Sequence, residues 1–189
     1  MNQPLNIIGS YNEFEIPEWL KLKDEAYEKC ASHKLDEISF CFHEPEWGWM
    51  DFDVYINGEE AHSAVFSEVY CPFEHMKTWM ESIANDTNQT YTLGIDVERS
   101  WLLFHYEPIN SEVGMFCIHE SYSDRLPVVC MCSAKQLVTS LYNKLIERML
   151  CDNTDLNWYG DDQIDEDENN HILYNIIKSP LIESFISDI

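Results

Sequence analysis

The feature that most limits the fold of this chain is a strongly one-sided helix signal between Ser133 and Leu150. Apolar residues recur there as adjacent pairs four positions apart, and every intervening pair is polar. The apolar pairs are Leu137 and Val138, Leu141 and Tyr142, Leu145 and Ile146, and Met149 and Leu150. This spacing places one continuous apolar stripe along a helix. Ser133 followed by Gln136 also fits a capping box at its start. Such a helix needs an apolar surface to cover.

Most of the chain before this helix alternates between apolar and polar residues, which is the pattern of strands with one buried face. We expect strands over residues 34–43, 49–57, 60–70, 91–99, 101–107, 113–120 and 126–132. Asn57-Gly58 predicts a two-residue hairpin, since both residue types tolerate a positive φ. Two prolines suited to the first turn of a helix predict further helices, from Pro17 to about Ala31 and from Pro72 to about Asn85.

The predicted fold is therefore α+β: a mostly antiparallel sheet of six to seven strands, with helices packed on one face and a helical C-terminal tail. The length of 189 residues suits a single domain. Its expected parts are an N-terminal arm over 1–15, an α+β core over 16–152, an acidic loop over 153–168 and a helical tail over 169–189.

The charge of the chain limits its partners. It has 35 acidic and 11 basic residues, which gives a formal net charge of −24. So large an imbalance repels nucleic acid and anionic membrane surfaces, and it favours basic proteins and cations. The alternative is that the charge serves solubility alone. We therefore expect a basic protein partner and neither a nucleic acid nor a membrane.

The cysteines and the N-terminal sequence indicate the compartment. The first 19 residues lack the basic and apolar regions of a signal peptide, and no stretch approaches the ~18 apolar residues of a membrane span. The seven cysteines are an odd number, which together with the missing export signal predicts reduced thiols in the cytosol. Most of them are expected to be small buried residues.

The acidic loop invites comparison with a calcium-binding loop. With Asp155 at position 1 of an EF-hand loop, Asn157 falls at position 3, Gly160 at position 6 and Glu166 at position 12. Position 5 is Tyr159, which offers no carboxylate or amide ligand. Calcium at Asp155, Asn157 and Glu166 is therefore one hypothesis, and a solvated acidic loop without a cofactor is the favoured one.

The sequence gives only weak signals for a transition-metal site or for catalysis. Three pairs sit two residues apart on predicted strands and could in principle converge on a soft cation: Cys41/His43, Cys117/His119 and Cys130/Cys132. Buried cysteines beside ordinary histidines are the simpler reading. The chain has no Gly-x-Ser-x-Gly elbow and no phosphate-cradling glycine loop, so an enzyme would have to assemble its site without a local motif.

The clearest candidate site is a surface that mixes carboxylates with aromatic residues. Its members flank the predicted hairpin or lie on the outward side of a later strand: Trp47, Trp49, Asp51, Asp53, Tyr55, Glu59, Glu60, Asp96 and Glu98. If these strands are neighbours, the residues form one face on which charge steers a basic protein and aromatic side chains anchor it. The alternative is an ordinary solvated sheet face.

Three short motifs carry a family resemblance. Tyr55-Ile56-Asn57-Gly58, then Cys71-Pro72-Phe73 with Trp79, then Ile95-Asp96-Val97-Glu98 resemble the layout of small acidic bacterial proteins of unassigned function. Some of these are immunity proteins of polymorphic or contact-dependent toxin systems. The resemblance covers about residues 50–150 and assigns no functional residue. It implies a cytosolic protein that binds and neutralises a cognate toxin, often a basic nuclease.

Together these features predict a non-enzymatic acidic binding protein of the immunity type, which inhibits a basic protein such as a toxin. A protein that mimics nucleic acid is a close variant, and it requires carboxylates repeated at the spacing of phosphates. A hydrolase that depends on a metal or on cysteine and histidine is the alternative from another class. The sequence does not indicate the oligomeric state.

Overall fold

The computed structural model describes residues 6–9, 16–29, 34–67, 72–98, 100–121, 123, 126–150 and 177–187, with the backbone alone for 16–20 and 29. Its helices are α1 (Ile16–Lys29), α2 (Phe73–Asn85), α3 (Ala134–Met149) and α5 (Pro180–Ser187). Its strands are β1 (Asn6–Gly9), β2 (Ile38–Phe42), β3 (Trp49–Ile56), β4 (Glu59–Ser67), β5 (Tyr91–Asp96), β6 (Trp101–Pro108), β7 (Gly114–Glu120) and β8 (Val128–Cys132).

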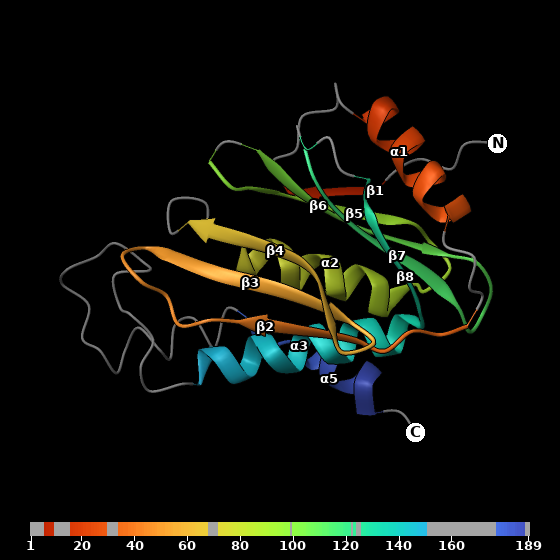
Figure 1. Cartoon of the computed structure of the whole chain (residues 1–189). Helices are drawn as coiled ribbons and strands as arrows, with labels where there is room; N and C mark the ends of the chain where they lie inside the picture. The colour runs from red at the N-terminus through yellow and green to blue at the C-terminus, as the bar shows by residue number, and fades with distance from the viewer. Residues whose placement is uncertain are drawn as a thin grey trace.

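The fold is α+β, as the sequence predicts, and the strands divide between two sheets (Figure 1). One sheet has five strands in the order β1-β5-β6-β7-β8, and the other has three in the order β2-β3-β4. All pairings are antiparallel except that of β1 with β5, which is parallel. The alternation in the sequence identifies the strands, but it does not say which strand pairs with which. The division into two sheets is therefore seen only in the structure.

The N-terminal arm adds an edge strand to the larger sheet. Asn6 to Gly9 pair with Tyr91 to Gly94, although the sequence shows only an irregular or extended arm there. Gly9 has a φ of +97°, and a Cβ on it would lie 2.2 Å from the carbonyl oxygen of Gly94. Two glycines facing each other thus let β1 approach β5 closely, which no larger residue would allow.

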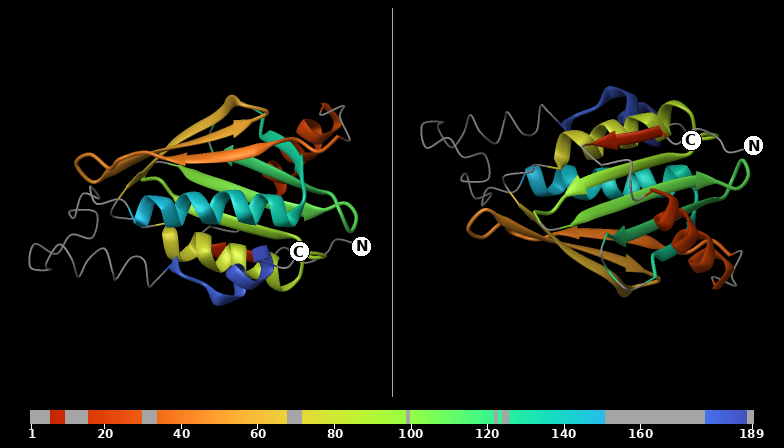
Figure 2. Two further views of the ribbon diagram at one scale, coloured as in Figure 1. Left: turned by 90° about the horizontal axis from the view of Figure 1, so that it is seen from below. Right: turned by 90° about the horizontal axis from the view of Figure 1, so that it is seen from above.

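The predicted helix α3 lies under both sheets and protects one edge of the smaller one (Figures 1 and 2). Its cap is the expected one, because the amide of Gln136 donates to the Ser133 hydroxyl at 3.1 Å. The Gln136 side chain does not complete a capping box; it donates to the carbonyl of Asp36 at 2.7 Å. The Ser140 hydroxyl likewise donates to the carbonyl of Ile38 at 3.0 Å. These bonds satisfy one carbonyl just before β2 and one at its start, along an edge that no described strand pairs.

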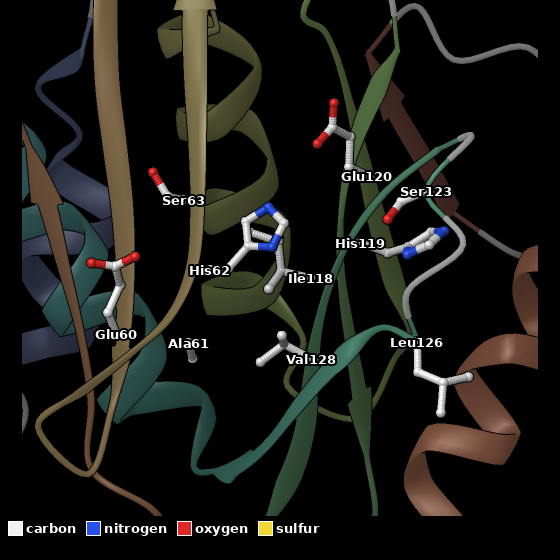
Figure 3. A pocket seen from close by; sticks show the side chains of 10 residues that line it. All are labelled: Glu60, Ala61, His62, Ser63, Ile118, His119, Glu120, Ser123, Leu126 and Val128. Carbon is white, nitrogen blue, oxygen red and sulfur yellow. The ribbon is translucent and has the colours of Figure 1, made fainter.

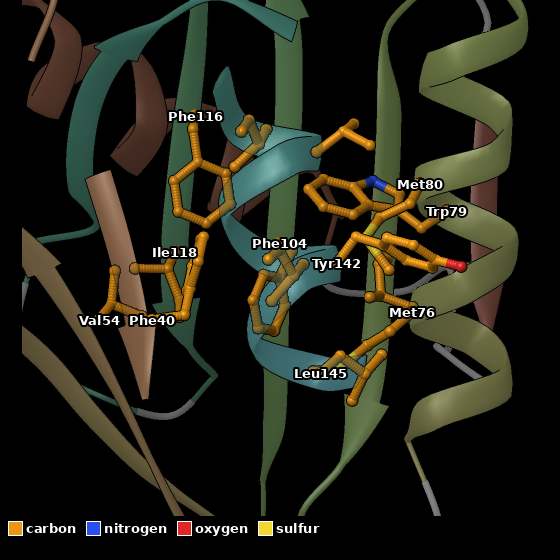
Figure 4. Packing of buried hydrophobic residues seen from close by; sticks show 14 of the residues in the cluster. Phe40, Val54, Met76, Trp79, Met80, Phe104, Phe116, Ile118, Tyr142 and Leu145 are labelled. Carbon is orange, nitrogen blue, oxygen red and sulfur yellow. The ribbon is translucent and has the colours of Figure 1, made fainter. Parts of the chain in front are cut away.

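The main core lies between the two sheets and the helices α2 and α3 (Figure 4). Phe104 of the larger sheet is at its centre, with ring centroids 5.8 Å from Phe52 of the smaller sheet and 5.9 Å from Trp79 of α2. The Trp79 indole also donates to the carbonyl of Tyr91 at 3.2 Å, so its one polar atom is satisfied. Aromatic packing of this kind joins the two sheets in one hydrophobic core.

The other face of the five-stranded sheet carries a smaller cluster under α1. This cluster contains Leu103, Met115, Cys117 and Met131. Lys23 of α1 reaches the sheet and forms an ion pair with Glu107. Helices α2, α3 and α5 therefore lie on the side of the main core, and α1 lies on the opposite face of the five-stranded sheet. None of the helices in the described ranges is long and apolar enough to cross a membrane.

Candidate protein-binding face

The outward side of the three-stranded sheet contains most of the predicted acidic and aromatic site. Strand pairing fixes which side chains share this side: Cys41 faces Asp53 across β2 and β3, and Asp53 faces Ser63 across β3 and β4. The inward side carries Phe40, Phe52 and Phe66, which pack into the core. The outward residues are Ser39, Cys41, His43, Asp51, Asp53, Tyr55, Glu60, Ser63 and Val65. We call this surface the acidic face.

The acidic face is open in the described part of the protein. The three-stranded sheet forms an outer layer of the molecule, with α3 at its β2 edge (Figure 2). Between Ile38 and Ser67 the carboxylates are Glu44, Glu46, Asp51, Asp53, Glu59 and Glu60, and there is no lysine or arginine. Apolar side chains remain in solvent beside them, since Trp47 is 91% exposed, Trp49 42% and Val65 40%. Charge and apolar area are thus combined on one surface.

Trp47 occupies an unusual position at one end of this face. The amides and carbonyls of Glu46 and Trp49 bond to each other at 2.8 and 3.0 Å, which closes a two-residue turn around Trp47 and Gly48. Both turn residues have positive φ, 56° and 81°, as a type I′ hairpin turn requires. A bulky residue at such a φ is strained, and asparagine or glycine is the usual occupant. The turn therefore keeps a strained tryptophan in solvent, where its ring adds little to packing.

A polar cluster occupies the middle of the face. His43 Nε2 lies 2.6 Å from Asp53 Oδ2, and the Tyr55 hydroxyl donates to the same oxygen at 3.4 Å. Burial alone would raise the pKa of Asp53, but hydrogen bonds from His43 and Ser63 and the charge of His43 outweigh it and lower that pKa. Burial and the Asp53 charge raise the pKa of the Cys41 thiol. Cys41 is thus held protonated, which is the opposite of an activated nucleophile.

The predicted site residues fall into three groups. Asp51, Asp53, Tyr55 and Glu60 share the acidic face, with Trp47 and Trp49 at one end and Glu59 at the other. Asp96 is the last residue of β5, in the other sheet, and Glu98 lies in the turn that follows it. Glu98 nevertheless approaches the Trp49 end, because it accepts a hydrogen bond from Ser67 at 2.6 Å and Ser67 pairs with Trp49. Asp96 lies apart, where it accepts from the Glu98 amide at 2.8 Å.

The paired cysteines and histidines do not come together. Cys41 and His43 lie on the acidic face, whereas Cys117 and His119 lie on the α1 side of the larger sheet. Cys130 and Cys132 point into the main core, on the opposite side of that sheet. Among the described residues, no group of three or more histidines, cysteines or carboxylates could hold a metal ion. The calcium candidates Asp155, Asn157 and Glu166 lie outside the described residues.

A second polar cluster, which the sequence does not reveal, lies beneath α1. Thr92 Oγ1 is 2.9 Å from His105 Nδ1, and His105 Nε2 is 3.3 Å from Glu107 Oε2. Burial lowers the pKa of His105. The hydrogen bond from His105 and the ion pair with Lys23 lower the pKa of Glu107 to about 2. Cys117 pairs with His105 across β6 and β7, which suggests a thiol nucleophile beside a base. Both are fully buried, so this arrangement serves packing in the state described.

A cavity of about 410 Å³ separates the start of β4 from the end of β7 and the start of β8 (Figure 3). It is lined by Glu60, Ala61, His62, Ser63, Ile118, His119, Glu120, Ser123, Leu126 and Val128. His62 extends from β4 toward the gap, and His119 lies beyond β8 near Ser123. Burial lowers the pKa of His119, and the neighbouring His62 adds to that effect. The two imidazoles come from different sheets and do not point at one centre.

Comparison with known proteins gives no relative on which to base a function. No family model, no curated protein and no solved structure matches the chain.

Proposed function

We propose that this is an acidic, non-enzymatic protein that binds and inhibits a basic protein through the acidic face. The observation that carries the proposal is Trp47, which is 91% exposed at a positive φ of 56°. Strain in an exposed turn that does not improve packing is typical of functional residues. A rigid, exposed aromatic ring is also the commonest anchor of a protein interface.

The charge of the face defines the partner. The strands of the sheet offer carboxylates without a lysine or arginine among them, and the whole chain carries −24. Such a field accelerates encounter with a basic protein and is screened by salt. The complex should therefore form fast at low salt and weaken as salt rises. A cytosolic immunity protein that neutralises a basic toxin is the biological role that we propose.

The arrangement favours a protein partner over mimicry of nucleic acid. A mimic needs a regular row of carboxylates, and β3 offers Asp51 and Asp53 in its outward row before Tyr55 interrupts it. The Asp53 carboxylate is in addition already paired, because its Oδ2 lies 2.6 Å from His43 Nε2. The face is therefore better described as an aromatic anchor surrounded by acidic groups.

The proposal is tested by identifying a partner and then substituting the anchor. A pull-down from a lysate of the source organism at low salt, eluted with a salt gradient, should release a basic protein in stoichiometric amount. Trp47→Asn should weaken that complex by about 2 kcal/mol or more, roughly thirtyfold in Kd. The same substitution should leave the free protein at least as stable, because asparagine suits this turn. Unchanged affinity for Trp47→Asn would refute the proposed face.

A matched pair of charge variants separates the face from overall charge. Asp51→Lys with Glu59→Lys changes two carboxylates of the three-stranded sheet, and Glu74→Lys with Glu112→Lys changes two exposed ones elsewhere. Both variants have the same net charge. The first should weaken the complex and reduce its salt dependence, and the second should have a much smaller effect. Equal losses would mean that the charge acts only at long range.

A further inference from the structure

Within the described ranges, strand β4 is an edge of the smaller sheet that no other strand pairs. The sheet order β2-β3-β4 leaves β2 and β4 at its two edges. The edge of β2 is covered by α3, where Ser140 and Gln136 bond to its carbonyl side. The backbone hydrogen bonds outside the regular elements, taken over the described residues, include none from Ala61, Ser63, Ala64, Val65 or Phe66. An unpaired strand edge is a template for pairing with another chain.

The hydrogen-bond pattern identifies the backbone groups that face outward from this edge. The amide of His43 donates to the carbonyl of Asp51 at 2.9 Å, so the odd residues of β3 bond to β2. The even residues Met50 and Phe52 must then bond to Phe66 and Ala64 of β4. In an antiparallel ladder the alternate residues turn their amides and carbonyls the other way. Ser63 and Val65 therefore present theirs at the open edge.

The sequence of this edge has few of the features that usually prevent pairing. From Ala61 to Ser67 the chain contains no Asp, Glu, Lys, Arg or Pro. Edge strands are commonly protected by a charge or a proline. A bulge between Val54 and Tyr55 disturbs the hairpin end, and the pairing is regular from Ser63 to Ser67. Ser63 and Val65 are both exposed.

There is room beside this edge. The cavity of about 410 Å³ runs along Glu60 to Ser63, and its far wall is formed by the end of β7 and the start of β8 (Figure 3). Glu60 and Glu120 contribute carboxylates to its lining, and neither lysine nor arginine is among the lining residues. A neutral strip of backbone is thus bordered by negative charge.

We infer that β4 accepts an extended, positively charged segment of the basic partner as a fourth strand of this sheet. The inference rests on the proposed function and extends it, because it assigns the partner's conformation. Three strands of five, eight and nine residues, about 4.8 Å apart, offer a projected area of roughly 350 Å². A stable complex needs about 800 Å² from each partner, so the acidic face alone is too small. The edge continues that face, and backbone pairing there adds both area and hydrogen bonds. A second copy of this chain is opposed by the −24 charge of each molecule.

The first test uses the full-length protein and a synthetic peptide, acetyl-KVTVTVK-amide, with acetyl-EVTVTVE-amide as the matched control. Backbone amide signals and hydrogen exchange are followed by NMR during each titration. The cationic peptide should shift the amide signals of Ser63 and Val65 and slow their exchange at least about tenfold. The acidic peptide should do neither. Binding of both peptides equally, or unchanged exchange at Ser63 and Val65, would overturn the inference.

Variants of Val65 then separate backbone pairing from side-chain effects. Val65→Pro removes the outward amide without removing a hydrogen bond to β3. It should weaken the binding of the cationic peptide at least about tenfold. Val65→Thr keeps the amide and should change the affinity by less than about twofold. Val65→Lys keeps the hydrogen bonds to β3 and should also weaken the binding of the cationic peptide, by charge repulsion. The denaturant midpoint of each variant shows whether it folds.

The outcomes distinguish the two levels of the proposal. A peptide that shifts Asp51 and Tyr55 but not Ser63 or Val65 would retain the acidic face and reject the edge. A lysate partner whose affinity falls with Trp47→Asn but not with Val65→Pro would likewise retain the acidic face and reject the edge. Edge amides that are protected without peptide, in a protein that sediments as a dimer, would make a second copy the occupant and overturn the inference.

Discussion

Replacing Glu107 by glutamine should destabilise the protein at neutral pH and make it less sensitive to acid. Glu107 forms the ion pair that fastens α1 to the five-stranded sheet, because Lys23 is buried and Glu107 is its closest carboxylate. His105 Nε2 also lies 3.3 Å from Glu107 Oε2, the same oxygen that Lys23 contacts. Glutamine keeps an oxygen that can accept from Lys23 and removes the negative charge. Among the described residues, the carboxylate that then remains beside the buried lysine is Asp24, at 3.4 Å.

The expected size follows from the pKa of Glu107. The hydrogen bond from His105 and the pair with Lys23 lower that pKa to about 2, against an unfolded value of about 4.3. A shift of that size corresponds to at most about 3 kcal/mol. Because the Glu107 side chain is 40% exposed, solvent screening reduces this, and we expect about 1–2 kcal/mol. The lowered pKa means that the stabilisation is complete above about pH 4.3 and is lost as the pH falls toward 2.

The assay is urea unfolding of the wild type and of Glu107→Gln between pH 7 and pH 2, followed by fluorescence. The difference in free energy of unfolding should be about 1–2 kcal/mol at pH 7 and should shrink below pH 4.3. Asp24→Asn is the matched control, because Asp24 is 72% exposed and should matter by less than about 0.5 kcal/mol. Equal stabilities at pH 7, or a difference that persists at pH 2, would refute the role of the ion pair.

Three further outcomes are expected. Phe104→Ala should lower the free energy of unfolding by about 3–5 kcal/mol, because Phe104 is fully buried where both sheets and α2 meet; a loss below about 1 kcal/mol would place the core elsewhere. Gly58→Ala should cost about 1 kcal/mol through its φ of +81° alone, since a Cβ there meets nothing within 4 Å; thermal melting measures it, and no change would contradict the turn. Asp53→Asn should speed alkylation of Cys41 a few-fold at pH 8, because the Asp53 charge helps to raise the pKa of that thiol; peptide mapping by mass spectrometry would show a slower or equal rate if the coupling is absent.

Local patterns in the sequence identified the elements well. The stripe between Ser133 and Leu150 corresponds to α3, and the Ser133 cap is present. Asn57-Gly58 forms the hairpin turn between β3 and β4, with φ of 54° and 81°. These features were predictable because side-chain periodicity and turn conformation depend on residues a few positions apart.

The candidate site was only partly predictable. Alternation in β3 correctly grouped Asp51, Asp53 and Tyr55 on one side of a strand, because that grouping follows from the pleat. Asp96 and Glu98 were grouped with them on the condition that their strands are neighbours, and this condition is not met, since β5 belongs to the other sheet. Glu98 reaches the Trp49 end of the acidic face only through its hydrogen bond with Ser67. The turn at Trp47-Gly48 was also missed, although Gly48, three residues after Pro45, was a usable signal.

The sequence by itself determined the α+β class, the places of the described helices and of every described strand except β1, the Asn57-Gly58 turn and the excess of negative charge. The tertiary structure alone decided that the strands form two sheets, that Asp53 meets His43 from another strand, and that Lys23 meets Glu107 across 84 residues. It also decided that α3 covers the edge of β2 and that no described strand pairs with the outer edge of β4. The physical reason is that strand pairing and buried ion pairs depend on packing between segments distant in the chain, which local periodicity does not encode.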